Sequence, residues 1–287
     1  MSNSTRRVLL VINPQREQAR KLALEIASEF HVSGFEVASS DTSLIPGSLP
    51  FQDPREVEAV IVLGGDGTIL RAAELVRGEN VPILGINMGN VGFLAEIVTP
   101  TSSQIVEAVL QKSYHGEPRL VIAFEILRNG LSLHKGWALN EVSIERSATQ
   151  MVELFVQIDN RPLSRWGCDG VICATPTGST AYAFSAGGPV LWPEVNAFVL
   201  LPLAAHALFS RPMVVSPESE IVIDVESETA EISADGIRKI DLVAGDRIVL
   251  TRDVSQVHLA HLGDGVFTDR LVAKFKLPVE GWRGERA

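Results

Sequence analysis

The strongest chemical signal in the sequence lies at Gly64 to Thr68, which reads GGDGT. Glycines let a backbone approach a phosphate closely, and the N-terminus of a following helix offers free N–H groups and a positive potential. Asp66 is unusual in such a loop because a carboxylate repels phosphate. It therefore needs another role, such as holding a metal ion or accepting a proton from a hydroxyl nucleophile. A plain turn in which Asp66 caps the helix is the alternative that involves no ligand.

Two familiar nucleotide-binding patterns are absent. The sequence contains neither the Walker pattern G-x-x-x-x-G-K-S/T nor the dinucleotide fingerprint G-x-G-x-x-G. Arg71 follows the loop in the expected helix and could reach back toward a phosphate. A solvated surface arginine explains Arg71 equally well, so the GGDGT loop itself carries the prediction of a phosphate site.

A second cluster of polar residues runs from Thr175 to Tyr182, with the sequence TPTGSTAY. Five of these eight residues carry hydroxyl groups, which suit the hydroxyl, phosphate or base groups of a nucleotide. The Tyr182 ring could also stack on a base. Asp169-Gly170 precedes the cluster, and Ser185 to Pro189 follows it with the sequence SAGGP. A Ser/Thr-rich turn without a ligand is the alternative.

A third and weaker signal is the pair Asn140-Glu141, which interrupts the otherwise apolar segment 137–143. Taken alone, the pair is better explained by a strand end or a bulge than by a ligand site. The six histidines form no catalytic triad and no metal-binding spacing.

The elements that position these motifs change in type near residue 115. Before it, strands and helices alternate, and the GGDGT loop directly follows an apolar run at 57–63. Such alternation implies parallel pairing, and open α/β sheets bind ligands at the carboxyl ends of their strands. Further strands are expected at 8–12, 35–38 and 81–86. The first helix is expected to begin with Asn13 as N-cap and Pro14 as first residue and to end before Gly34, and other helices are expected at 69–77 and near 102–112.

After residue 119, one short strand follows another. Asn129-Gly130 is typical of a hairpin turn between two of them. Other strands are expected at 153–158, 221–226, 247–250 and 257–262. The predicted fold class is therefore α/β plus β, with an N-terminal open α/β domain at 1–115 and a C-terminal antiparallel β-rich domain at 116–269.

The composition excludes several classes of partner. Lys and Arg number 25 and Asp and Glu 35, and the formal charge of −10 argues against a nucleic-acid or anionic-membrane partner. Cys168 and Cys173 are too few for a disulfide framework or a structural zinc site, and they fit a reducing compartment. The longest apolar stretch, 197–209, is interrupted by Pro202 and too short to span a bilayer. We therefore expect a cytoplasmic protein that acts on small molecules.

Together and in this order, the motifs resemble those of the NAD kinase family. His206 to Phe209 with Arg211-Pro212, and Phe267 to Val272 (FTDRLV), extend the resemblance, particularly to actinobacterial members. The resemblance covers about Val8 to Gly284. The GGDGT motif alone is shared with diacylglycerol, sphingosine and phosphofructo-kinases, so the threonine-rich motif is the more specific one.

The resemblance implies transfer of a terminal phosphoryl group from ATP or polyphosphate to the 2′-hydroxyl of the adenosine ribose of NAD, giving NADP. A divalent cation, magnesium, is implied as the cofactor, with unknown protein ligands. Asp66 is the implied proton acceptor. The implied donor-side residues are Gly64, Gly65, Gly67 and Thr68. The implied NAD-binding residues are Asp66, Gly67, Arg71, Asn140, Glu141, Asp169, Thr180, Ala181, Tyr182, Ala183, Phe184 and Ser185.

The resemblance also makes 1–115 the phosphate-donor domain and 116–269 the NAD-binding domain, with 270–287 returning to the first. It implies a homotetramer, and Trp166, beside Asp169, is a candidate interface anchor. Gln150 stands where relatives often carry a basic residue, and it is left out of the predicted site. The competing hypotheses are a lipid kinase of the diacylglycerol type and a non-catalytic NAD(P) sensor.

Overall fold

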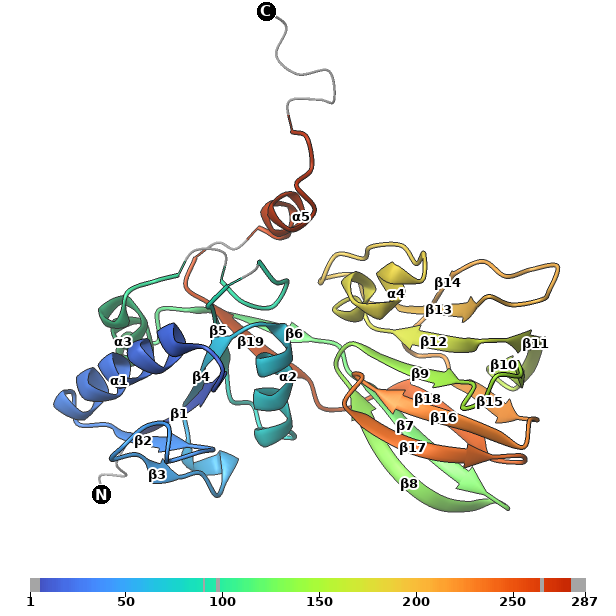
Figure 1. The fold of residues 1–287 in the computed structure, drawn as a ribbon, viewed down its shortest axis with the longest axis horizontal. Coiled ribbons are helices and arrows are strands. Elements are labelled where there is room, and N and C mark those ends of the chain that lie inside the picture. Colours follow the sequence, from blue (N-terminus) through green and yellow to red (C-terminus); the bar gives the residue numbers. More distant parts are fainter. Residues whose placement is uncertain (1–5, 90, 97–98, 264–265, 280–287) are drawn as a thin grey trace, which may run out of the picture. The chain divides into compact units, whose positions relative to one another are not determined.

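The structure, a computed structural model, describes residues 6–89, 91–96, 99–263 and 266–279. The chain divides into two compact units (Figure 1). The first comprises Met1–Pro118 and Val257–Ala287, and the second comprises Arg119–Gln256. None of the helices in the described ranges has the length and apolar character that a membrane crossing requires.

A seven-stranded sheet forms the centre of the first unit, in the order β3-β2-β1-β4-β5-β19-β6. β1 pairs in parallel with β2 and β4, and β5 pairs in parallel with β4 and β19. β4 is buried along its whole length, as its continuous apolar sequence predicts. The strands are β1 (Arg7–Ile12), β2 (Glu36–Ser39), β3 (Leu49–Pro50), β4 (Ala59–Gly64), β5 (Ile83–Asn87), β6 (His115–Arg119) and β19 (Val257–His261).

The helices of this unit follow from periodic apolar residues and local caps. α1 (Glu17–Val32) begins after Arg16 and not at Asn13-Pro14, so the predicted start is wrong. Within it, Ala19, Ala23, Ile26 and Phe30 recur at helical spacing and are buried. Gly34 ends that helix in the left-handed region, at φ 79°. The other helices are α2 (Asp66–Leu75), α3 (Ser102–Gln111), which begins with a capping box at Thr101 and Gln104, and α5 (Phe267–Phe275), with a 3-10 turn η1 at Pro54–Glu56.

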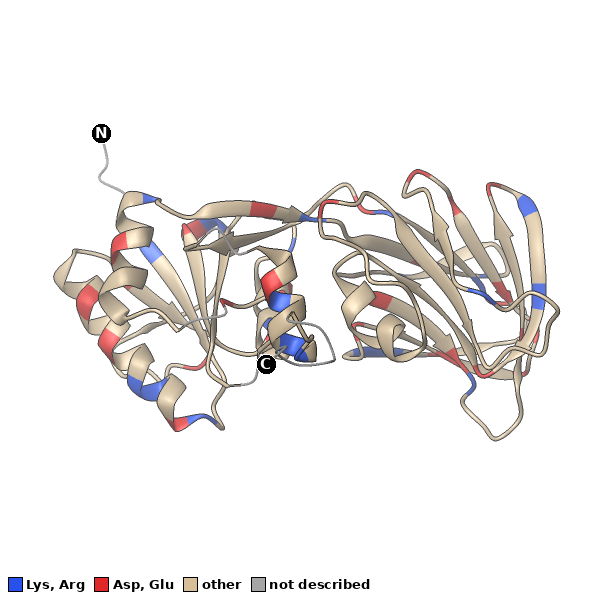
Figure 2. Cartoon of the chain, turned by 90° about the horizontal axis from the view of Figure 1, so that it is seen from above, with Lys and Arg blue, Asp and Glu red and all other residues tan. Residues whose placement is uncertain are grey.

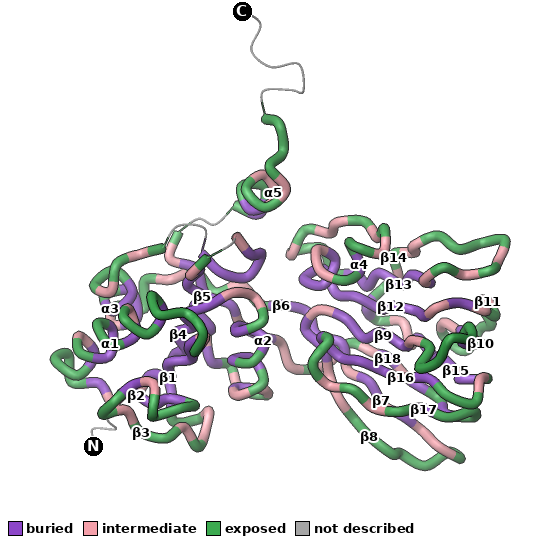
Figure 3. The backbone as a smooth tube through the Cα atoms, in the orientation of Figure 1, coloured by how far each residue is buried: buried purple, intermediate pink, exposed green. Residues whose placement is uncertain are grey.

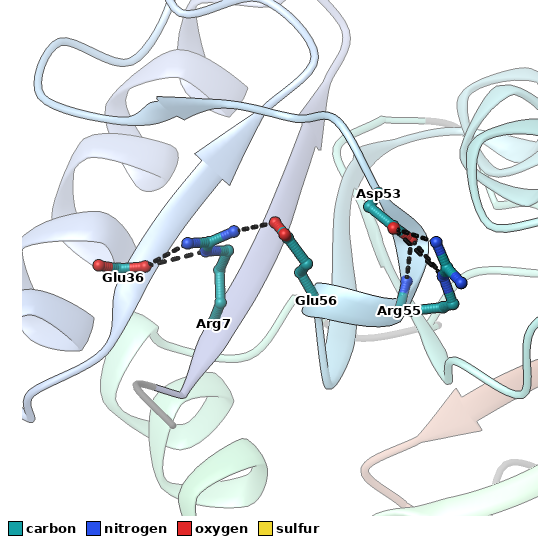
Figure 4. A network of polar contacts seen from close by, with 5 residues as sticks. All are labelled: Arg7, Glu36, Asp53, Arg55 and Glu56. Carbon is teal, nitrogen blue, oxygen red and sulfur yellow. Dashed lines mark hydrogen bonds and ion pairs between the residues drawn. The ribbon is translucent and has the colours of Figure 1, made fainter. Parts of the chain in front are cut away.

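Ion pairs tie the amino end of β1 to its neighbours (Figure 4). Arg7 donates to Glu36 on β2 at 2.6 Å and also pairs with Glu56 of η1. Asp53 and Arg55 form a separate pair beside η1. Acidic and basic residues are interspersed over both units, and each of the arginines in Figure 4 is neutralised by a carboxylate (Figure 2).

The second unit contains two six-stranded sheets, ordered β11-β10-β15-β18-β7-β8 and β14-β13-β12-β9-β16-β17. The pairings are antiparallel. The predicted hairpin joins β7 to β8, with positive φ at Asn129 and Gly130. The bounds are β7 (Ile122–Arg128), β8 (Leu131–Ala138), β9 (Glu141–Glu145), β10 (Val152–Ile158), β11 (Arg161–Cys168), β12 (Gly170–Ala174), η2 (Gly178–Thr180), α4 (Tyr182–Ser185), β13 (Phe198–Leu203), β14 (Met213–Val215), β15 (Ile221–Val225), β16 (Thr229–Ala234), β17 (Arg238–Val243) and β18 (Arg247–Arg252).

Buried residues occur along strands of both sheets of the second unit (Figure 3). One cluster of buried side chains joins the two sheets, with Val142 and Ile144 from one sheet and Leu154 and Val156 from the other. Trp166 is fully buried in this cluster. The prediction of Trp166 as an interface anchor is therefore wrong: the pleat of β11 directs this side chain into the sandwich core.

The predicted fold class is confirmed, but the second domain boundary differs. The sequence pattern places the strand at 257–262 in the β-rich domain and ends that domain at 269. In the structure, Leu259 and Ala260 of β19 pair with Ile83 and Leu84 of β5, and the second unit ends at Gln256. A short apolar run has the same pattern in either kind of sheet, so its strand partner is not readable from sequence. Within the returning tail, 280–287 lie outside the described residues.

Candidate active site

The GGDGT loop joins β4 to α2 at the topological switch point of the first sheet. The strand order reverses between β1 and β4, since β2 lies beyond β1 and β5 lies beyond β4. The carboxyl ends of the two strands are held together by the Asn13 N–H, which donates to the Leu63 carbonyl at 3.0 Å. Open α/β sheets bind ligands in this crevice.

The glycines of the loop serve different purposes. A Cβ at Gly64 would lie 2.4 Å from the Thr68 hydroxyl, so packing within the protein requires glycine there. A Cβ at Gly65 or Gly67 would meet no described atom within 4 Å, and neither glycine has a positive φ. Neither packing nor backbone geometry therefore explains Gly65 and Gly67. They leave the first N–H groups of α2 open to a bound group.

Asp66 does not cap α2, so the capping alternative is wrong. Its side chain instead holds the loop that follows β5: Oδ2 accepts from the Phe93 N–H at 3.0 Å and Oδ1 accepts from the Leu94 N–H at 3.2 Å. A Cβ at Gly92 would lie 2.2 Å from Oδ1. The carboxylate is half-buried, and each oxygen keeps a lone pair for a further partner.

Arg71 lies on the outer face of α2. The helix begins at Asp66, earlier than the pattern at 69–77 predicts, so Arg71 falls in its second turn. Gly67, Arg71 and Glu74 are exposed and share one face at helical spacing. Arg71 thus lies on the same face as one loop glycine, four residues away.

Glu141 is a buried carboxyl group at the start of β9. Its side chain accepts the Tyr182 N–H, but Oε2 has no hydrogen-bond partner among the described residues. Burial is the main cause that raises the pKa of Glu141 to about 7, and the charges of Asp235 and Glu145 act in the same direction. Such a group is suited to a hydroxyl partner, because it can donate or accept a hydrogen bond near neutral pH. Asn140 lies before β9 at a strand end, as its weak signal indicates.

Asp235, which sequence reasoning missed, holds Asn140-Glu141 in place. Its carboxylate accepts the Leu139 N–H at 3.1 Å and the Asn140 N–H at 2.6 Å, and its own N–H donates to the Glu141 carbonyl at 2.9 Å. Arg238 pairs with it at 2.5 Å. The Asp235-Gly236 dipeptide, with positive φ at both positions, is a hairpin signal that could have directed attention to this turn.

The hydroxyls at the start of the threonine-rich motif bond within the protein. The buried Thr175 hydroxyl donates to the Leu139 carbonyl at 2.5 Å, and the buried Ser179 hydroxyl donates to the Pro176 carbonyl at 2.7 Å. Thr177 accepts from the Arg119 guanidinium at 3.2 Å. The O–H groups of Thr175 and Ser179 therefore shape the turn. Thr177 only accepts in its contact with Arg119, so the interpretation of its hydroxyl as a ligand donor stays a prediction.

That turn lies directly against Asn140. A Cβ at Gly178 would lie 2.1 Å from the Asn140 carbonyl oxygen, and the Thr175 N–H donates to the same oxygen at 2.8 Å. The structure thus brings together the second and third predicted motifs, although Asn140 and Thr175 are 35 residues apart in sequence. The close approach of two backbones explains why position 178 is glycine.

An open pocket of about 850 Å³ lies beside this turn in the second unit. Asp169 pairs with Arg146 at 2.8 Å, and the Tyr182 hydroxyl donates to Glu145 at 3.1 Å. Burial, followed by the Glu145 charge, raises the pKa of Tyr182 to about 12. The sequence reasoning named three lining residues but missed Glu145 and Arg146. The lining residues are Glu145, Arg146, Ser147, Ala148, Thr149, Asp169, Tyr182, Ser185, Ala186 and Leu203.

The remaining predicted residues of the second unit differ in access. Thr180 and Ala181 are half-buried, and Phe184 is exposed. Ala183 is fully buried against β12 and β13, so its side chain serves packing. The predicted site residues therefore form two groups: Gly64 to Arg71 in the first unit and Asn140 to Ser185 in the second.

Family models match both units of the chain. The model of the ATP-NAD kinase N-terminal domain matches residues 45–114, and that of the ATP-NAD kinase C-terminal domain matches residues 139–262. The chain belongs to the NAD kinase family. The family resemblance read from the sequence is thus confirmed, and the match at 139–262 contains the threonine-rich motif.

Relatives of known name agree with this assignment. NAD kinase 2 of Streptomyces avermitilis is 50% identical over 230 residues, covering 79% of this chain and 76% of its own. The NAD kinase of Mycobacterium bovis is 44% identical over 303 residues, covering 98% of this chain and 99% of its own.

Two solved structures share the fold. Yeast NADH kinase complexed with NADH superposes with a TM-score of 0.86 at 22% identity, covering 99% of this chain and 91% of its own. An NAD kinase from Archaeoglobus fulgidus in complex with ATP gives a TM-score of 0.73 at 26% identity, covering 95% of this chain and all of its own.

Proposed function

We propose that this kinase transfers the terminal phosphoryl group of ATP or polyphosphate to the 2′-hydroxyl of the adenosine ribose of NAD, giving NADP. The observation that carries the proposal is Asp66, a half-buried carboxylate at the positive end of α2 beside two glycines that packing does not require. Phosphoryl transfer depends mainly on positioning and charge neutralisation. Asp66 accepts the proton of the attacking hydroxyl, and the N–H groups of Gly65 and Gly67 face the donor phosphates.

The second unit supplies the dinucleotide side. Glu141 offers an unpartnered oxygen for a ribose hydroxyl, and Asn140, its neighbour, is held by Asp235. The pocket lined by Asp169, Tyr182 and Ser185 receives another part of NAD. The yeast NADH kinase structure holds NADH and the Archaeoglobus fulgidus NAD kinase structure holds ATP, which supports both kinds of nucleotide as ligands of this chain.

A divalent cation, magnesium, fits this arrangement as a companion of the donor. The described residues hold no cluster of three or more His, Cys, Asp or Glu side chains that would form a protein cage. Magnesium commonly binds through one or two carboxylates, substrate phosphates and water, and Asp66 is the carboxylate at the donor loop. When bound, the ion neutralises charge on the phosphates.

The decisive assay measures NADP formation from NAD by the purified chain with magnesium and either ATP or polyphosphate. We expect turnover with at least one donor, and competition between the two donors measures their preference. Diacylglycerol serves as the control acceptor and should remain unphosphorylated. NAD binding by calorimetry without NADP formation from either donor would overturn the proposal in favour of a sensor.

We further propose that the active form is a homotetramer in the cytoplasm. Exposed apolar side chains in the second unit, including Trp192, Leu208 and Phe209, favour burial against another copy. The two free, buried cysteines fit a reducing compartment. Light scattering at assay concentration should give four subunits. Mixing Asp66→Asn and Asp169→Ala subunits should restore part of the activity if one site draws on two subunits, whereas a fully active monomer would contradict the assembly.

A further inference from the structure

Arg270 of α5, within the FTDRLV motif, is a buried cation that none of the functions above uses. Its side chain is only 1% exposed. Burying a charged group costs free energy unless the group is paired and hydrogen-bonded, so a buried arginine usually holds a particular neighbouring group in position. Burial lowers the pKa of Arg270, while the charges of Glu96, Glu117 and Asp66 oppose that change.

The Arg270 guanidinium donates a hydrogen bond to one peptide group of the loop after β5. Its Nη1 donates to the Phe93 carbonyl at 2.8 Å. The N–H of the same peptide group, which belongs to Leu94, donates to Asp66 Oδ1 at 3.2 Å. A single peptide group therefore connects a buried cation to the Asp66 carboxylate. Hydrogen bonds in such a chain polarise one another, and each end here is charged.

Other contacts of α5 hold the same loop. The Phe93 ring packs against Phe267 and Phe275, with centroid distances of 5.9 and 5.8 Å. Lys274 Nζ donates to the Val91 carbonyl at 2.8 Å. Lys274 is exposed and does not bind the peptide group between Phe93 and Leu94, which makes it a matched control for Arg270.

A cluster formed by His261, Glu96 and Glu117 lies beside the Arg270 guanidinium. Its Nη2 lies 3.0 Å from His261 Nδ1, and His261 also lies 3.3 Å from Glu96 and 3.0 Å from Glu117. The Leu262 N–H donates to Glu96 at 2.9 Å. Burial lowers the pKa of His261, but the hydrogen bonds that the Glu117 and Glu96 carboxylates accept from the ring outweigh burial and raise it. The Arg270 guanidinium therefore contacts His261 of this cluster on one nitrogen and the Phe93 carbonyl, in the loop that Asp66 holds, on the other.

We propose that Arg270 is a positioning residue for Asp66, whose carboxylate it holds in place through the peptide group between Phe93 and Leu94. The inference rests on the proposed role of Asp66 as proton acceptor. It assigns a function in the reaction to α5, whose sequence lies far from the GGDGT loop. Arg270 need not touch either substrate.

The test compares Arg270→Gln, Arg270→Lys and Lys274→Ala by steady-state kinetics. We expect Arg270→Gln to lower kcat about tenfold or more with little change in KM for NAD, equivalent to about 1.4 kcal/mol. A loss of kcat without a change in KM distinguishes positioning of Asp66 from a general loss of structure. Arg270→Lys should recover part of kcat, and Lys274→Ala should match the parent.

A double-mutant cycle separates this inference from the proposed function. In an Asp66→Asn background, Arg270→Gln should cause no further loss of kcat, since both act through the same carboxylate. If the kcat losses of the two substitutions multiply, or if Arg270→Gln raises KM and leaves kcat unchanged, the positioning role is overturned. Full activity of Asp66→Asn would instead overturn the proposed function. If Arg270→Gln does not fold, the same cycle with Arg270→Lys decides the question.

Discussion

Asp66 in the first unit and Asp235 in the second each accept hydrogen bonds from the N–H groups of two consecutive residues. Asp66 binds Phe93 and Leu94, and Asp235 binds Leu139 and Asn140. Their surroundings differ. Asp235 is 8% exposed and pairs with Arg238, whereas Asp66 is half-buried at the N-terminus of α2. The same pair of backbone hydrogen bonds thus occurs once at a buried carboxylate, Asp235, and once at a partly exposed carboxylate, Asp66.

The difference indicates which carboxylate can do chemistry. Burial raises the pKa of Asp235, and the backbone N–H groups and Arg238 oppose that rise. All of its bonds are internal, so it serves to shape the segment at 139–141. Asp66 holds a loop in the same way but keeps access to a substrate at the positive end of a helix. A proton acceptor needs both a fixed position and this access.

The largest expected effect comes from Asp66→Asn. We expect kcat to fall by about 10²–10⁴-fold, because the amide cannot accept the hydroxyl proton, while one oxygen still holds part of the loop. The melting temperature should change little. Glu25→Gln, an exposed acid-to-amide change on α1, is the control. A near-parental kcat with unchanged KM would remove Asp66 from the reaction, and loss of folding would make its role structural.

Asp235→Ala should instead act on stability. It removes the acceptor for two backbone N–H groups and the partner of Arg238, so we expect a loss of about 3 kcal/mol in the free energy of unfolding. Urea denaturation measures this loss. Asp241→Ala, an exposed change on the neighbouring β17, should be neutral. A stable Asp235→Ala variant with low kcat would mean that Asp235 is the reactive carboxylate and would reverse the comparison.

Asn140→Ala tests what Asp235 positions. The Asn140 N–H remains bonded to Asp235 in this variant because that contact uses the backbone. We expect NAD binding to weaken by about 1–3 kcal/mol, as for a lost buried polar partner, with donor binding unchanged. Calorimetry with NAD and with ATP measures the two affinities. Equal weakening of both, or lower stability with normal kinetics, would indicate a purely structural residue.

Glu141→Gln should give the smallest effect, seen as a change in pH dependence. The pKa of Glu141 is about 7 in the folded chain against an ordinary 4.5, so the folded state holds this proton more tightly. Stability should therefore fall as pH rises through that interval, by at most about 1.4 kcal/mol per pH unit. Glu141→Gln should remove this slope in urea denaturation. Asp235, whose pKa is also raised, remains in both proteins, so an unchanged slope would assign the effect to Asp235.

The sequence correctly predicted the strands and loops that depend only on the pattern of neighbouring residues. The apolar run of β4 predicted a buried strand, and the GGDGT loop was expected at its carboxyl end, where the structure places it. Pairing between distant segments was not predictable. The position of β19 depends on β5, the role of Asp235 depends on Asn140, and the burial of Thr175 depends on Leu139. Each of these contacts joins residues whose own neighbours in sequence give no hint of the partner.

The place of β19 in the first sheet has a consequence for biosynthesis. β19 lies between β5 and β6, and the whole of Arg119–Gln256 separates it from them in the chain. On the ribosome, β5 therefore remains an unpaired edge until residue 261 has emerged, and exposed edges invite association with other chains. The second unit is one continuous segment, so its sheets can be completed once Gln256 has emerged, before β19 of the first unit is available. The sheet that carries the GGDGT loop is therefore completed only after the whole second unit has been made.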